Sequence, residues 1–170
     1  MRPPKPLGFD PIAEARKNWD NNGWQDSSLG MAMVTSVMRA QQILLARVHD
    51  TLKPFDLTFA QFEALRLLAF SRAGRLPLGK IGSRLQVHPA SVTNVIDRLE
   101  SKGLVQRLQH PDDMRTTLAA ITRTGRSVTK KATKALNAQV FRNSGLDDDR
   151  LESLVEVVTE MRLAAGDFTE

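Results

Sequence analysis

Apolar residues recur at helical spacing along most of the 170-residue chain, which predicts a mainly α-helical protein. Proline and glycine mark several boundaries: Pro11 and Pro89 open predicted helices, and Gly74 and Gly103 follow predicted ends. The pattern changes to two short extended runs separated by the turn HPDDM, which predicts a β-hairpin. The predicted helices cover about residues 10–22, 28–53, 58–73, 78–85, 89–102, 122–145 and 147 onward, and the predicted strands cover 104–109 and 116–121.

Two of the predicted helices carry more apolar surface than one chain needs to bury. The helix from Ser28 to Lys53 is apolar on more than one side, a pattern typical of helices buried between layers or subunits. The last helix also has an apolar face, from Leu151 to Met161. We interpret both helices as a dimer interface, because a monomer would expose too large an apolar patch. Charged residues within the long helix argue against a membrane span; they are Arg39, Arg47 and Asp50.

The amino-acid composition limits the classes of protein and of binding partner that this chain can represent. The hydrophobic content of 41% in 170 residues predicts one domain, and the absence of cysteine excludes disulfides, Cys-based zinc sites and thiol chemistry. The start, MRPPKPLGFDP, lacks the apolar segment of a signal peptide, so we expect a cytoplasmic protein.

The basic residues are concentrated in one part of the chain. Residues 72–131 hold 12 Lys and Arg against 4 Asp and Glu, whereas the remaining residues hold 12 Lys and Arg against 15 Asp and Glu. This local excess is typical of a polyanion-binding surface, although a solvated basic surface would have the same composition.

The helices at 78–85 and 89–102, joined by a short turn, predict a helix-turn-helix at about 78–102. Val92, Val95, Ile96 and Leu99 fall on the inner side of the second helix, and small polar residues fall on the outer side. A slim polar face of this kind can enter a DNA major groove, which is about 12 Å wide. The simpler interpretation is an ordinary solvated face. The candidate DNA contacts are Ser91, Thr93, Asn94 and Arg98, with Asn94 suited to reading adenine.

The hairpin that follows adds further candidates. Arg115, near its tip, would lie within reach of a minor groove or the DNA backbone, where a permanent charge is suited. The alternative is a surface salt bridge with Asp113. Candidate phosphate contacts, which could equally be charges that confer solubility, are Lys80, Arg84, Lys102 and Arg107. We expect His88 and His110 to flank the DNA surface and His49 to lie near the dimer junction; their spacing predicts no metal site, and nothing indicates a cofactor.

Three segments resemble the MarR family of winged-helix bacterial transcription regulators: LTFAQFEALRLL, LGKIGSRLQVHPASVTNVIDRLESKGLVQR and HPDDMRTTLAAITRTG. The resemblance covers about residues 37–163 and implies a homodimer on a palindromic double-stranded DNA operator, often released by a small ligand. Asp113 and Arg115 match the family's D-x-R wing pattern, which implies an aspartate that orients the wing and an arginine that reaches DNA. Met114 stands where the family often has another arginine, which puts one DNA contact in doubt.

The resemblance and the pattern together predict the domain organisation. An N-terminal arm with a short helix occupies residues 1–27, and a MarR-type domain occupies 28–170. Within it, residues 28–54 and 122–170 form dimerisation helices around a winged helix-turn-helix at 55–121, whose wing covers about 104–121. The expected fold is therefore mainly α with a small β wing.

These features predict a homodimeric, sequence-specific DNA-binding regulator that represses its own or a neighbouring gene. Relatives with an additional tryptophan-bearing helix respond to anionic or aromatic molecules, so Trp19, with Arg47 or His49, is a candidate ligand pocket; otherwise Trp19 packs the arm onto the dimer. The alternatives are a winged helix that binds a protein and a regulator without a ligand. We do not expect an enzyme, because the chain has no G-x-G-x-x-G, H-E-x-x-H or G-x-S-x-G motif and no obvious acid/base pair.

Overall fold

The computed structural model describes residues 6–169; the first five residues of the predicted arm and the last residue of the predicted dimerisation segment lie outside this range. The chain forms two compact units that meet between Asp50 and Thr51. The first contains α1 (Pro11–Asn21) and most of α2 (Gln25–Leu52). The second contains a 3-10 turn (Lys53–Phe55), α3 (Phe59–Phe70), β1 (Arg75–Pro77), α4 (Leu78–Leu85), α5 (Pro89–Ser101), β2 (Val105–Gln109), β3 (Thr117–Ile121), α6 (Arg123–Leu136), a π-helical turn (Asn137–Phe141) and α7 (Asp148–Ala164).

Local capping signals place the predicted helices where the sequence indicates. Asp10 caps α1, since its Oδ1 accepts a hydrogen bond from the N–H of Ile12 at 2.9 Å. Thr58 and Gln61 form a reciprocal capping box at the start of α3, as their spacing predicts. The long helix α2 begins at Gln25, three residues before the predicted Ser28, and ends at Leu52 just before Pro54.

Helix α2 leaves most of its apolar side chains uncovered within one chain. Met38 is 59% exposed and Leu44 is 49% exposed, whereas Val48 near the end of the helix is buried. By length and composition alone, the stretch Gln25–Phe55 could cross a bilayer, with a mean hydropathy of 1.2 in its most apolar window. Either a second chain or another apolar phase must therefore cover this helix.

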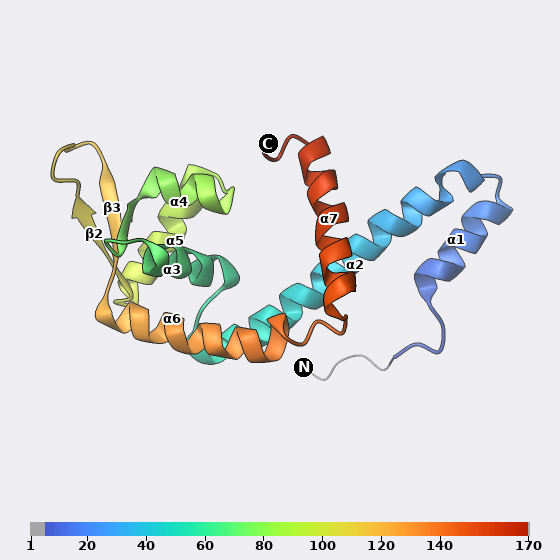
Figure 1. Ribbon diagram of the computed structural model, residues 1–170, viewed down its shortest axis with the longest axis horizontal. Helices are drawn as coiled ribbons and strands as arrows, with labels where there is room; N and C mark the ends of the chain where they lie inside the picture. The colour runs from blue at the N-terminus through green and yellow to red at the C-terminus, as the bar shows by residue number, and fades with distance from the viewer. Residues whose placement is uncertain (1–5, 170) are drawn as a thin grey trace. The chain divides into compact units, whose positions relative to one another are not determined.

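The second unit surrounds its own hydrophobic core. Leu65, Leu68, Ile81, Ile96 and Leu99 are fully buried, and they come from α3, α4 and α5. Figure 1 shows α3 between α4 on one side and α6 on the other. The winged unit is therefore packed by residues of a single chain.

A three-stranded antiparallel sheet in the order β1-β3-β2 closes one end of this unit. The β2–β3 hairpin agrees with the prediction and pairs Val105 with Ile121 and Leu108 with Leu118. The third strand, β1, was not predicted, because three residues ending in Pro77 carry no alternating pattern. Its place at the sheet edge accommodates that proline, which has no N–H to donate.

Close packing explains two glycines of the winged unit, one in α4 and one in α6. A Cβ on Gly82 would lie 3.0 Å from Cγ2 of Val92, so the glycine of α4 lets α5 pack tightly against it. A Cβ on Gly125 would lie 2.1 Å from the carbonyl oxygen of Leu104, where α6 begins against β2. Glycine lowers the intrinsic stability of a helix, but Gly82 allows α5 to pack closely against α4.

The C-terminal helices differ from the prediction in detail. The helix expected to run from Thr122 toward Gly145 changes at Asn137 into one π-helical turn that ends at Phe141. Asp147 caps α7 by accepting a hydrogen bond from the N–H of Arg150, and Asp148 and Asp149 follow in the first turn, where the helix dipole favours negative charge. No residue of α7 is buried within the described chain, so its apolar side chains are also uncovered.

Candidate nucleic-acid interface

Helix α5 presents the slim polar face that the sequence predicts. His88 caps it, because its Nδ1 accepts a hydrogen bond from the N–H of Ala90 at 3.2 Å, and Pro89 occupies the first turn. The inward residues Val92, Ile96 and Leu99 are buried, and Val95 is half-buried. The exposed residues of this helix include Ala90, Ser91, Thr93, Asn94, Asp97, Arg98 and Ser101.

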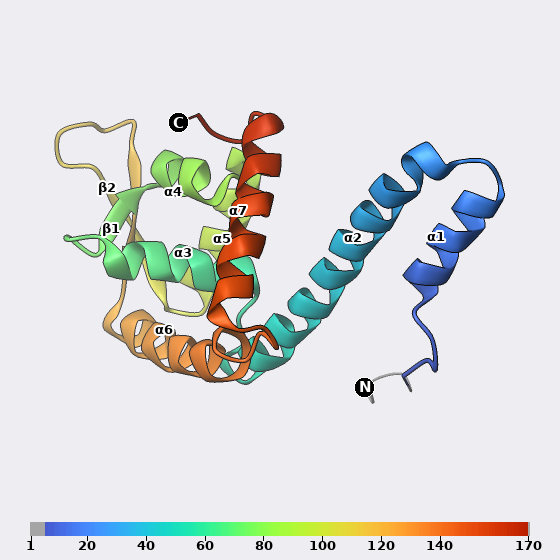
Figure 2. The ribbon, with the colours of Figure 1, turned by 45° about the vertical axis from the view of Figure 1, so that its right-hand side comes forward.

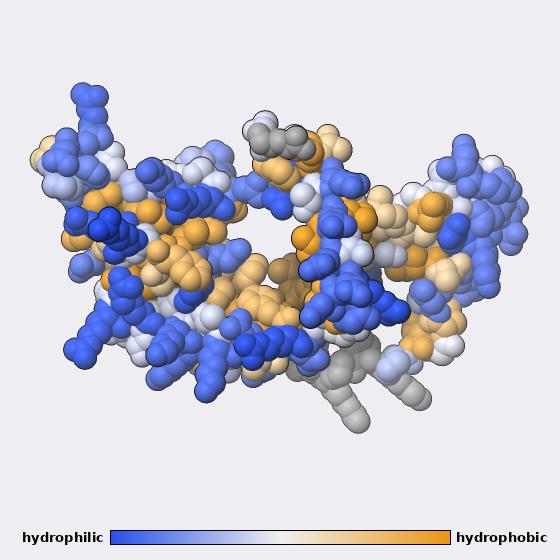
Figure 3. Space-filling model, viewed as in Figure 1, coloured by the Kyte–Doolittle hydropathy of each residue, from blue (hydrophilic) through white to orange (hydrophobic). Residues whose placement is uncertain are grey.

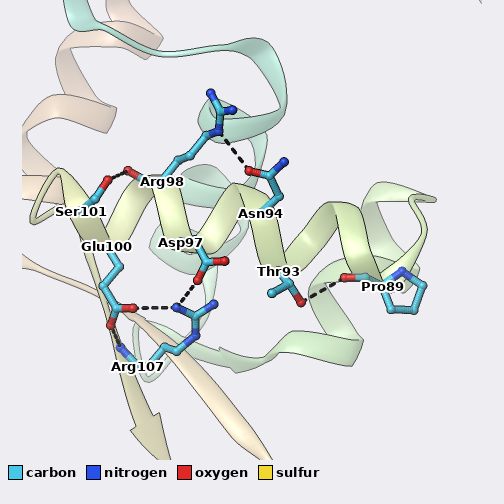
Figure 4. A network of polar contacts seen from close by, with 8 residues as sticks. All are labelled: Pro89, Thr93, Asn94, Asp97, Arg98, Glu100, Ser101 and Arg107. Atoms are coloured by element: carbon cyan, nitrogen blue, oxygen red, sulfur yellow. Dashed lines mark hydrogen bonds and ion pairs between the residues drawn. The ribbon is translucent and has the colours of Figure 1, made fainter.

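Three of the candidate DNA-contact residues on α5 are held in place by side-chain hydrogen bonds. Nε of Arg98 donates to Oδ1 of Asn94 at 3.0 Å, one helical turn apart (Figure 4). The hydroxyl of Thr93 donates to the carbonyl oxygen of Pro89 at 3.3 Å. The amide nitrogen of Asn94 and the outer nitrogens of Arg98 remain available to an external partner, so the pair resembles a pre-oriented donor surface.

Arg107 of β2 links the wing to α5 through ion pairs with two carboxylates. Its Nη1 lies 2.6 Å from Oδ1 of Asp97 and 2.6 Å from Oε2 of Glu100 (Figure 4). The backbone N–H of Arg107 also donates to Oε1 of Glu100 at 2.8 Å. These hydrogen bonds from Arg107, the backbone one foremost, lower the pKa of Glu100 below its ordinary value. The arrangement fixes the angle between α5 and the hairpin.

Arg107 and Lys102 were predicted as phosphate contacts, and the structure pairs both with acidic groups instead. Lys102 Nζ lies 3.0 Å from Oδ2 of Asp56 and also donates to the carbonyl oxygen of Asp56. A phosphate would have to compete with these carboxylates for either cation. Both cations are therefore partly neutralised within the chain, and phosphate contact by either of them stays a prediction.

The wing tip is organised by Asp113. Its Oδ1 accepts from the backbone N–H of Arg115 at 3.0 Å, and its Oδ2 accepts from the hydroxyl of Thr116 at 2.7 Å. The Thr116 hydroxyl and then the Arg115 N–H lower the pKa of Asp113, which keeps it ionised. Among the described residues, Arg115 forms no ion pair with Asp113, so its exposed guanidinium is available to DNA. The neighbouring Met114 is 74% exposed and adds no charge.

The remaining candidates of the basic surface lie on α4 and in the wing. Lys80 and Arg84 are exposed on α4. His110 has a structural role in the wing turn, where its Nδ1 accepts from the N–H of Asp112 at 3.2 Å. Within residues 6–169, no group of three or more His, Asp and Glu side chains is arranged to hold a metal ion.

The three candidate ligand residues do not meet within one chain. Trp19 packs edge to face on Trp24 with ring centroids 5.1 Å apart, at the corner before α2 begins. Arg47 lies 22 residues beyond Gln25, the first residue of α2, which at 1.5 Å per residue is roughly 33 Å along the helix. His49 is exposed and lies 3.7 Å from Asp50. A pocket built from all three by one chain is therefore excluded by the length of α2.

Sequence reasoning missed the acidic partners Asp97 and Glu100. The helix period places Asp97 on the outer face of α5 and predicts no partner for either carboxylate, yet both bind Arg107 of β2. Their spacing of three residues on one helix face was visible, but nothing in the sequence gives the register that brings β2 beside α5. The Asn94–Arg98 contact, in contrast, could have been predicted from its spacing of four residues.

Comparisons with known proteins identify the family. The MarR family profile matches residues 57–117. The chain is 30% identical over 146 residues to the HTH-type transcriptional regulator MhqR of Bacillus subtilis, covering 83% of this chain and 92% of that protein. A second relative from that organism, the uncharacterized regulator YhbI, is 36% identical over 81 residues, and the match spans only 51% of its length.

Solved structures agree with this assignment. Sco5413, a MarR family transcriptional regulator from Streptomyces coelicolor, is 49% identical, with a TM-score of 0.74 and coverage of 83% of this chain and 98% of that chain. Sco3205 from the same organism, solved in complex with DNA, is 23% identical, with a TM-score of 0.69 and coverage of 81% and 87%. With its winged helix-turn-helix, exposed α5 face and ordered wing, the chain belongs to the MarR family of DNA-binding transcriptional regulators.

Proposed function

We propose that the protein is a homodimeric, sequence-specific repressor in the cytoplasm that inserts α5 into the DNA major groove. The observation that carries this proposal is the exposed face of α5, where Ser91, Thr93 and the Asn94–Arg98 pair stand without a bulky apolar side chain. Asn94 would contact base edges, and the hydroxyls would contact phosphates or bases.

Exposed cations frame this face. Lys80 and Arg84 lie on the preceding helix, and Arg115 lies at the wing tip. In the proposed complex the α4 residues contact phosphates and Arg115 reaches the minor groove or backbone, where its charge is favoured. Asp113 positions Arg115 by holding the turn.

A second copy of the chain would cover the exposed apolar side chains of α2 and α7. Both helices carry apolar residues that are more than a third exposed, among them Leu44 and Val155. Burial of such surface stabilises a dimer by roughly 25 cal/mol per Å². Two α5 helices related by a twofold axis would read half-sites about 34–36 Å apart, which implies a palindromic operator.

The DNA complex of Sco3205 supports duplex DNA as the partner class. At 23% identity the likeness establishes the shared fold, and the residue assignments above rest on this chain's own geometry. The alternative, a winged helix that binds a protein, has no specific feature in its favour, whereas the exposed cations around α5 favour a polyanion.

Release from DNA by an anionic or aromatic ligand stays part of the proposal. Because one chain cannot bring Trp19 to Arg47 and His49, a site that uses these residues needs a second chain. The alternative role of Trp19 is to hold α1 against the start of α2 through Trp24. Replacing Trp19 by Phe separates the two: altered release by an inducing compound supports the ligand role, and unchanged release with lower thermal stability supports the packing role.

The test of the main proposal is fluorescence anisotropy with the DNA upstream of the gene and a scrambled duplex, each over a salt series. We expect the upstream DNA to bind at least roughly a thousandfold more tightly, and both affinities to fall with salt. Equal affinities for all genomic fragments would contradict sequence-specific regulation. Absence of binding at low salt would favour the protein-partner alternative.

A further inference from the structure

A second basic surface lies in the winged unit, between α3 and the C-terminal half of α6. It is a groove of about 680 Å³. Figure 3 shows hydrophilic side chains projecting from α6 along the lower edge of the view. Five cationic side chains line the groove: Arg66, Lys130, Lys131, Lys134 and Arg142.

The helical repeat of α6 brings several of these positive charges close together. Lys130 and Lys134 are four residues apart and share one face of α6, where like charges repel each other. Arg66 of α3 faces them from across the groove and is positioned by its own ring contact, with its guanidinium carbon 3.9 Å from the centroid of Phe70. These three cations therefore repel one another weakly and together attract an anion.

Within residues 6–169, none of the five cations forms an ion pair with a carboxylate. This includes Glu63, which stands three residues before Arg66 on α3. Polar side chains of Ser127 and Asn137 also line the groove and can donate hydrogen bonds to an oxyanion. The groove therefore combines unpaired charge with neutral donors.

The groove is separate from the proposed DNA interface. In Figures 1 and 2, α6 lies on the opposite side of α3 from α4, which is the first helix of the helix-turn-helix. None of the groove residues belongs to α4, α5 or the wing. The cations of the groove therefore lie outside the proposed operator-binding surface.

We propose that this groove binds a small anion that carries two or more phosphate groups. Its volume falls in the range of small-molecule sites, roughly 300–1,000 Å³. Several cations at helical spacing match the several charges of an oligophosphate better than the single charge of a monocarboxylate. This site goes beyond the proposed operator binding and does not depend on it.

The test is isothermal titration calorimetry of the full chain with tripolyphosphate, with citrate and with inorganic phosphate, at matched ionic strength and without DNA. We expect saturable binding of one tripolyphosphate per chain, and binding of inorganic phosphate at least roughly tenfold weaker because it makes fewer charged contacts. Citrate binding as tight as that of tripolyphosphate would replace the phosphate assignment with a polycarboxylate one. No saturable binding of any of the three would overturn the proposal.

Variants locate the site. Lys130→Gln with Lys134→Gln should weaken tripolyphosphate binding at least roughly tenfold. Arg16→Gln with Lys17→Gln removes the same charge from exposed positions of α1 and should leave binding unchanged. Because a polyphosphate could also bind the DNA face, Arg98→Gln with Arg115→Gln is the third arm. Binding that is lost in this third variant and kept in the groove variant would show that the DNA face is the site and would overturn the proposal.

Discussion

Helices α2 and α5 both carry an apolar face, but the chain covers that of α5 and leaves most of that of α2 exposed. Ile96 and Leu99 of α5 are fully buried, whereas Val37 and Met38 of α2 are 46% and 59% exposed. The winged unit thus has a core of its own, whereas the exposed apolar side of α2 is suited to burial against the partner chain of the proposed dimer. In the proposed dimer, the recognition surface would fold within one chain, and dimerisation would set the spacing between two such surfaces.

The largest expected effect comes from disrupting the proposed dimer interface on the apolar face of α2. Val37→Glu with Leu44→Glu places two charges seven residues apart on the apolar side of the helix, and should weaken dimerisation at least roughly a thousandfold, or about 4 kcal/mol. Sedimentation equilibrium measures the dissociation constant, and circular dichroism verifies that the helices remain.

A matched control lies on the polar side of the same helix. Thr35→Glu with Gln42→Glu has the same spacing and adds the same charge at exposed positions. It should remain dimeric at the same concentration. Equal behaviour of the two variants would show that the exposed apolar face of α2 is not the dimer interface.

Packing of the winged unit is tested by Gly125→Ala. The new Cβ would lie 2.1 Å from the carbonyl oxygen of Leu104, so we expect the free energy of unfolding to fall by about 2–3 kcal/mol in urea titrations. The control is Gly79→Ala, where no heavy atom lies within 4 Å of the added Cβ and alanine favours the helix. An unchanged free energy of unfolding in Gly125→Ala would mean that α6 can move away from Leu104 without loss of stability.

The recognition face is tested by Asn94→Ala. This change removes the side chain that would contact a base, so operator affinity should fall by about 1–2 kcal/mol while affinity for scrambled DNA changes little. Anisotropy titrations of both duplexes measure this difference. Asn18→Ala on α1 is the control, and an equal loss for operator and scrambled DNA would assign Asn94 to phosphate contact rather than base reading.

The smallest expected effect is on the pH dependence of stability, through the ion pair between Arg107 of β2 and Glu100 of α5. The lowered pKa of Glu100 means that its ionised form is favoured by folding: its contribution is full above the ordinary value of 4.5 and is lost as pH falls through the lower folded value. Arg107→Gln should therefore cost stability at pH 7 and less at pH 3. Because Glu100 is 39% exposed, the difference should stay below about 1 kcal/mol. Urea titrations at both pH values measure it, and a pH-independent difference would contradict the carboxylate's role.

Features encoded within a few residues could be predicted from the sequence. Asp10, Thr58 and Pro89 begin helices where expected, because capping depends on donors and acceptors two or three residues away. The polar face of α5 follows in the same way from the helix period. The DNA-contact roles of Asn94 and Arg115 stay predictions that the anisotropy experiments test.

Features that join distant segments were decided only by tertiary structure. The short strand β1 exists because β3 pairs with it. Arg75 pairs with Ala120, which follows 45 residues later in the chain, too far for a local sequence signal. Likewise, Arg107 binds Asp97 and Glu100 because the hairpin returns beside α5, and Arg66 faces Lys130 because α3 packs against α6. The sequence by itself determined the helices, their exposed faces and the family; the packing of elements far apart in the chain determined which charges are neutralised and which remain available to a ligand, because that depends on distances no local spacing specifies.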